Sequence, residues 1–262
     1  MMTLKSLIFE KLKNGGLNKN DVVMLHSNIG PLFKFLKKQK YNFEVKDIAE
    51  CIMEYFSSNG TLIIPTFNFE FCKGKSFSLK NTPSKMGVLS EEFRIISQKN
   101  RTWHPVYSFS IFGKIPKRQI ENRNYSAFGK DSVFQWLFER NGKIAVLDLP
   151  DQNSMTFYHY VEQKLNVEWR FHKNFNADYI DFNNKLFKNL KASIFVRKIE
   201  KNFEILTDVN GMQKILFAKD LYISEKNNST QGLRSIRTKE IFKEVETVIK
   251  NNLGEGTLYK KI

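Results

Sequence analysis

Two short apolar runs on either side of an amphipathic segment constrain the fold of this chain more than any other feature. Residues 21–27 and 61–65 each have the length and β-branched content of a buried strand. Between them, residues 44–57 carry apolar side chains at i, i+3, i+4, i+7, i+8 and i+11, the spacing of an amphipathic helix. Because short loops join the three segments, they predict a βαβ unit with parallel strands and a right-handed crossover.

The same alternation continues as far as residue 170 and then changes. Asn28 to Pro31 is expected to be a turn, and the segment 101–105 a polar loop. We predict helices over 2–13, from 82–84 onward and over 132–140, and strands over 107–112 and 143–149. Beyond Arg170, strands are expected at 177–182, 192–199 and 203–206, followed by a late helix that uses Ile236, Ile241, Val245, Val248 and Ile249.

These patterns predict an α/β fold with three layers, α/β/α, a largely parallel central sheet and an antiparallel C-terminal extension. We expect a single domain, 1–262, with a soft division into an α/β core (1–170) and a C-terminal lobe (171–262). Binding residues in such sheets cluster where the parallel strands end. His26 and Ser27 end one strand, and Pro65, Thr66 and Phe67 end the next.

The stretch 143–164 reads as strand, loop and helix and carries the candidate chemistry. Its helix is expected to start near Ser154 or Thr156, with a hydroxyl capping the free backbone N–H groups. On that helix His159 and Glu162 are three residues apart, so they lie on one face. A carboxylate beside an imidazole fixes its tautomer, which suits a general base at neutral pH. The spacing alone does not show that the pair is catalytic, since most His and Glu residues three apart on a helix are ordinary surface or core residues.

Composition excludes several classes of protein. No apolar run approaches the ~20 residues of a membrane-spanning helix, and residues 1–9 lack a signal-peptide core, so we expect a cytoplasmic protein without a membrane partner. Cys51 and Cys72 are too few for a disulfide framework and lack the spacing of a metal site, so no metal is expected.

The net charge of +15 raises the question of nucleic acid. The lysines are scattered along the chain, and no zinc-finger, RNP-like or helix-turn-helix signature occurs, so we expect no nucleic-acid partner. A basic surface also suits a polyanionic cofactor or a nucleotide-linked substrate.

Six short motifs, in this order and spacing, are together specific. They read VMLHS at 23–27, GTLIIPTF at 60–67, NTPSKMGVLSEEFR at 81–94, RTWHP at 101–105, FGKDS at 128–132 and TFYHYVE at 156–162. The ordered set resembles the aminoglycoside 3-N-acetyltransferases, the antibiotic N-acetyltransferase family. Residues after 170 match only loosely.

The resemblance implies an enzyme that binds acetyl-coenzyme A as co-substrate in its α/β core and transfers the acetyl group directly to an amine, without a metal. The family's His and Glu fall on His159 and Glu162, which would serve as the base. Ser27 and Thr66 are plausible donors to the oxyanion. The residues expected to line the coenzyme and its thioester are His26, Ser27, Asn28, Pro65, Thr66, Phe67, Thr82, Ser84, Met86, Arg101 and His104.

The chain departs from the family at the loop that faces the substrate. Aminoglycoside-modifying members usually carry glycines where this chain has Asp-Leu-Pro-Asp at 148–151, and the family's Asn is here Met155. A chain of net charge +15 also attracts a polycation poorly. Because 158–162 and 169–171 resemble relatives that acetylate sugars for surface polysaccharides, we expect an amino sugar carried on a nucleotide diphosphate.

Three alternatives stay open. The first is an aminoglycoside 3-N-acetyltransferase, and the second is a basic protein that binds nucleic acid or another polyanion. The third keeps the fold but lacks activity because its substrate loop has diverged. The sequence does not determine the oligomeric state.

Overall fold

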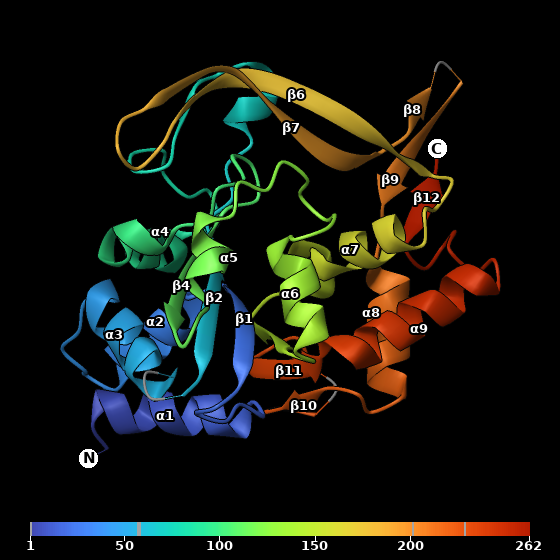
Figure 1. Cartoon of the computed structure of the whole chain (residues 1–262). Coiled ribbons are helices and arrows are strands. Elements are labelled where there is room, and N and C mark those ends of the chain that lie inside the picture. The colour runs from blue at the N-terminus through green and yellow to red at the C-terminus, as the bar shows by residue number, and fades with distance from the viewer. Residues whose placement is uncertain (1, 57–58, 201, 228) are drawn as a thin grey trace.

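The structure is a computed structural model that describes residues 2–56, 59–200, 202–227 and 229–262 (Figure 1). Its centre is a six-stranded sheet of order β10-β11-β5-β1-β2-β4. The strands are β1 (Val22–Ser27), β2 (Thr61–Pro65), β4 (Phe109–Gly113), β5 (Lys143–Leu147), β10 (Ile223–Ser224) and β11 (Leu233–Arg237). β1 pairs in parallel with β2 and β5, whereas the outer pairs are antiparallel. The predicted α/β class is confirmed, and the sheet is mixed rather than largely parallel.

Helices cover both faces of the sheet, as the three-layer prediction requires. Alternate side chains of β1 enter different core clusters, Val23 and Leu25 on one face and Met24 on the other. The first face packs against α1 (Leu4–Asn14), α2 (Gly30–Lys38), α3 (Val45–Phe56) and α4 (Val88–Ile96). The second packs against α6 (Val133–Glu139), α7 (Phe157–Lys164), α8 (Asn210–Ala218) and α9 (Thr238–Lys250).

A long hairpin of β6 (Arg170–Ile180) and β7 (Leu186–Arg197) arches over the molecule at the top of Figure 1. It forms a sheet with β3 (Phe77–Ser78), and a second small sheet consists of β8 (Ile199–Glu200), β9 (Phe203–Thr207) and β12 (Tyr259–Lys261). The remaining elements are the short helices α5 (Lys117–Glu121), η1 (Glu70–Lys73), η2 (Gln98–Asn100) and η3 (Asp151–Asn153). The predicted antiparallel extension is therefore present.

The structure corrects two helix starts in the first half of the chain. α4 begins at Val88 rather than at 82–84, because the Ser84 side chain accepts the Met86 N–H in a turn and Gly87 has φ of 101°. α2 begins at Gly30 where a turn was expected, since the Asn28 side chain accepts the Gly30 N–H and Pro31 suits a first helical turn.

Further corrections concern strands and caps. The strand predicted from residue 107 begins at Phe109, and the loop 101–105 is buried rather than a solvated polar loop. α7 starts at Phe157 without a hydroxyl cap, because Ser154 Oγ donates to the Pro150 carbonyl. α3 is described over Val45–Phe56, and Ser57, the predicted last residue of that helix, lies outside the described residues.

The C-terminal third contributes more to the centre than the sequence indicated. β11, which was not predicted, pairs with β5 inside the main sheet, and Ile236 lies on it rather than on the late helix. α8 was also missed. One core cluster contains residues from both sides of position 170, such as Phe134 and Val245. Within the described part of the chain, no helix is long and apolar enough to cross a membrane.

Candidate active site

α7 brings the two predicted catalytic residues into contact. Its first turn follows η3, which a short segment, 148–150, joins to the carboxyl end of β5, so the helix starts near the edge where the parallel strands end. His159 Nδ1 lies 2.7 Å from Glu162 Oε2. The Glu162 side chain is 2% exposed and that of His159 is 20% exposed. The predicted His159–Glu162 contact is confirmed, and its role in catalysis stays a prediction.

Trp169 and Arg170, neither of them a predicted site residue, also contact Glu162. Trp169 Nε1 donates to Glu162 Oε1 at 2.8 Å, and Arg170 Nε forms an ion pair with Glu162 Oε2 at 2.7 Å. Arg170 is the first residue of the hairpin and Trp169 comes just before it, so the start of the C-terminal part of the chain lies at the site. A buried carboxylate needs a cation or donors, and that requirement was the available signal for these residues.

These contacts determine the ionisation of the pair. Burial raises the pKa of Glu162, but Arg170 and then His159 lower it more, to about 2. Burial, followed by the Arg170 cation, lowers the pKa of His159, although Glu162 opposes the shift. At neutral pH Glu162 is therefore ionised and His159 neutral. The Nδ1 proton points at the carboxylate, and the lone pair is on Nε2.

A chain of aromatic rings connects His159 with two other predicted site residues. The Phe128 ring lies 5.8 Å from the His159 ring and 4.9 Å from that of Tyr107, between centroids. Tyr107 in turn contacts Phe67 at 4.8 Å and His104 at 6.1 Å. The structure thus brings Phe67 and His104 to within two rings of the candidate base.

The strand-end residues have different surroundings. His26 is 7% exposed, its Nε2 has no hydrogen-bond partner among the described residues, and burial lowers its pKa to about 3. Ser27 is half-buried and Asn28 is exposed. Thr66 is fully buried, and its N–H donates to the Ser108 carbonyl while its hydroxyl pairs with Ser108 Oγ. Pro65 lies buried where β2 ends.

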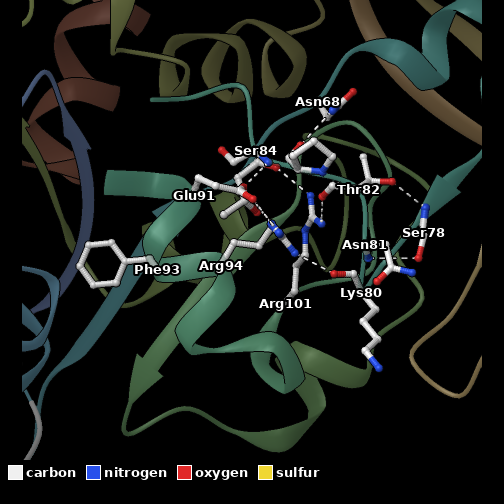
Figure 2. A network of polar contacts seen from close by, with 12 residues as sticks. Asn68, Ser78, Lys80, Asn81, Thr82, Ser84, Glu91, Phe93, Arg94 and Arg101 are labelled. Carbon is white, nitrogen blue, oxygen red and sulfur yellow. Dashed lines mark hydrogen bonds and ion pairs between the residues drawn. The ribbon is translucent and has the colours of Figure 1, made fainter. Parts of the chain in front are cut away.

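Arg101 lies in the interior of a polar network (Figure 2). It is 1% exposed, and its guanidinium donates to Ser108 Oγ and to the carbonyls of Leu79, Thr82 and Thr66. Because these bonds occupy most of its N–H groups, we interpret Arg101 as holding these loops rather than as a contact for the coenzyme.

The predicted residues of the 82–86 turn belong to the same network. Thr82 Oγ1 accepts the Ser78 N–H, and the Ser84 N–H donates to Glu91, which pairs with Arg94 (Figure 2). Met86 is half-buried and packs against the core. Thr82 and Ser84 thus shape the turn, and any contact with the coenzyme stays a prediction. No group of three or more metal-ligating side chains occurs among the residues described.

Comparison with known sequences gives a family. A family model described as aminoglycoside 3-N-acetyltransferase matches residues 24–249. The chain is also 24% identical over 185 residues to the SPbeta prophage-derived aminoglycoside N(3')-acetyltransferase-like protein YokD of Bacillus subtilis (strain 168). That match covers 62% of this chain and 65% of YokD, just under two thirds of its length.

Comparison with solved structures gives the fold. The crystal structure of YokD from Bacillus subtilis has a TM-score of 0.71 at 18% identity and covers 94% of this chain and 99% of that one. The structure of AAC-IIIb in a binary complex with CoASH has a TM-score of 0.72 at 14% identity and covers 96% of this chain and 97% of that one. The structure of AAC-VIa bound to sisomicin has a TM-score of 0.69 at 15% identity and covers 95% of this chain and 97% of that one. Because the family model spans most of the sequence and the fold agrees, this chain belongs to the aminoglycoside 3-N-acetyltransferase family, whose members are N-acetyltransferases that depend on acetyl-coenzyme A.

Proposed function

We propose that this protein transfers the acetyl group of acetyl-coenzyme A to an amino group of an amino sugar, with His159 as general base. The observation that carries the proposal is the contact between His159 and the buried, ionised Glu162. That contact leaves Nε2 of a neutral imidazole to accept a proton. Two relatives support the ligands by their names, since AAC-IIIb was solved with CoASH and AAC-VIa with sisomicin.

The chemistry follows from the proton that an amine must lose. The amine nitrogen attacks the thioester carbonyl carbon while His159 Nε2 takes its proton, and the carbonyl oxygen becomes an oxyanion. When the C–S bond then breaks, the imidazolium returns the proton to the departing thiolate. Glu162 stabilises the transient imidazolium and keeps the ring oriented. Acetyl amide and free coenzyme A are the products.

The oxyanion needs donors that are not already engaged. Thr66 no longer qualifies, because its N–H and hydroxyl both have Ser108 as partner. Ser27, half-buried at the end of β1, remains the candidate donor. We keep His26, Asn28, Pro65, Phe67 and His104 as candidate contacts for the coenzyme.

The acceptor is the less determined ligand. Relatives named for aminoglycosides favour an aminoglycoside amine. A net charge of +15 favours a second candidate, an amino sugar on a nucleotide diphosphate as used for surface polysaccharide, because a net positive protein attracts a diphosphate. The two candidates share the amine chemistry, and they differ in the sign of the charge on the rest of the molecule.

Incubation with acetyl-coenzyme A and a panel of aminoglycosides, nucleotide-linked amino sugars and simple amines should release thiol with at least one amino sugar. His159→Ala should lose most of that rate, by about 10²-fold or more, while coenzyme binding measured by calorimetry stays nearly intact. An unchanged rate in the mutant would remove His159 from the mechanism, and a wild-type protein inactive on the whole panel would contradict the proposed function.

A further inference from the structure

Glu162 is shared between the candidate base and a cation. Its Oε2 atom lies 2.7 Å from His159 Nδ1 and also 2.7 Å from Arg170 Nε, while Oε1 accepts the Trp169 indole N–H. The carboxylate is buried, so water does not screen these charges. Nothing about general-base chemistry requires the arginine, since Glu162 alone would fix the imidazole tautomer.

Arg170 is itself fixed from the C-terminal part of the chain. Its Nη2 donates to Thr207 Oγ1 at 2.9 Å, and Nη1 donates to the Phe195 carbonyl at 3.4 Å. These partners lie on β9 and β7, and Arg170 is the first residue of β6. Three strands therefore hold the guanidinium against Glu162, and the Arg170 side chain is only 5% exposed.

The arrangement solves an electrostatic problem. A buried carboxylate bonded to a lone imidazole favours the protonated ring, and an imidazolium cannot accept a proton from the substrate. Two charged side chains act on His159 among the described residues, Glu162 from α7 and Arg170 from β6, and Phe128 contributes only an uncharged ring at 74° to that of His159. Arg170 neutralises Glu162, so the ring need not carry the countercharge.

We propose that Arg170 is a positioning residue that keeps His159 in its neutral, proton-accepting form by holding the negative charge of Glu162. Thr207 sets the angle of the guanidinium, and Trp169 holds the second carboxylate oxygen. The hairpin and β9 thereby contribute to a base that lies on α7. This inference rests on the proposed role of His159 as the base.

The test replaces Arg170 by Met and compares two readouts. In the pH dependence of kcat/KM for the acceptor, the acid limb should move to higher pH by about one unit, the order expected when one adjacent charge is lost. In the free protein, the His159 ring should titrate at correspondingly higher pH by NMR of labelled histidine, with His159→Gln used to assign its signal among the four histidines. The control is Arg140→Met, which removes one exposed cation outside the site and should move neither midpoint.

Two further variants separate charge from geometry. Arg170→Lys keeps the cation but not the planar donor set, so its acid limb should stay near that of the wild type while kcat falls. Thr207→Val removes the Nη2 acceptor and should lower kcat several-fold without moving the acid limb. If Arg170→Met does not fold, Arg170→Gln carries the same expectation.

Several outcomes would overturn the inference. The inference is wrong if neither the acid limb nor the His159 titration moves in Arg170→Met or Arg170→Gln. It is also wrong if these variants only raise the KM for the acceptor, because Arg170 would then be a substrate contact. The NMR titration needs no turnover, so it tests Arg170 even where the acceptor panel fails. An active wild type with an unmoved Arg170→Met profile would leave the proposed function standing without the arginine.

Discussion

Burial keeps two histidines of this protein, His26 and His104, in the neutral form. His26 and His104 are almost fully buried, and burial lowers the pKa of the first to about 3 and of the second to about 4. His104 Nδ1 accepts the N–H groups of Val106 and Tyr107, which a protonated ring could not do. Both rings are therefore neutral in the folded protein down to acid pH.

Acid should destabilise the fold through these two rings. In the unfolded chain they titrate near 6.5, so between that pH and about 4 the unfolded state binds more protons than the folded state. The stability they contribute is complete above pH 6.5 and is lost as the pH falls, by about 1.4 kcal/mol per pH unit for each ring. Urea unfolding at pH 4.5 to 7, about the range of this titration, should show that slope.

The control for this prediction is a matched pair of substitutions. His26→Leu should reduce the slope by about one ring's share. His172→Leu, at an exposed position on β6, should leave it unchanged. Equal slopes in the wild type and His26→Leu would mean that the buried ring does not titrate as its surroundings indicate.

At the scale of elements, a buried carboxylate joins the loop before α7 to the edge of the sheet. Asp151 in η3 accepts the hydroxyls of Tyr158 and Tyr222 at 2.8 and 2.7 Å, and Arg234 Nη2 lies 2.8 Å from it. Asp151 and Arg234 are each at most 1% exposed. The segment 148–151, which departs from the family and was predicted to face the substrate, thus includes an anchor for α7, the helix that carries His159.

Removing the cation from this anchor should lower the free energy of unfolding by more than the loss of one surface ion pair would. Arg234→Met leaves the Asp151 charge buried without its cation, and we expect a loss of about 3–5 kcal/mol in the free energy of unfolding. Arg118→Met, which removes an exposed arginine on α5, should change it by less than about 0.5 kcal/mol. Urea denaturation of both variants at neutral pH checks the difference, and similar midpoints would contradict the anchor.

At the scale of the whole molecule, the positive charge acts on ligands before they reach the site. A net charge of +15 attracts polyanions over about a Debye length and repels polycations. Acetyl-coenzyme A carries several negative phosphate charges, so its encounter gains from this field. A protein that only binds polyanions, the alternative from another class, would depend on the same positive charge but would catalyse no reaction.

Salt should therefore separate the candidate ligands. Raising the salt concentration should raise KM for acetyl-coenzyme A, and it should also raise KM for a nucleotide-linked acceptor. For an aminoglycoside, KM should fall, because screening removes repulsion. Steady-state kinetics over a salt series checks the signs. A polycationic acceptor whose KM rises with salt would show that local acidic groups outweigh the net charge.

The sequence by itself determined what depends on neighbours along the chain. Apolar spacing identified the βαβ unit and the layers, and i,i+3 spacing on one helix placed His159 against Glu162, because both are consequences of local geometry. The tertiary structure decided what depends on residues far apart. It paired β11 with β5, engaged Arg101 and Thr66 in the interior, and brought Trp169, Arg170 and Thr207 to Glu162. A buried charge requires a partner, but only the packing of the chain determines which residue that partner is.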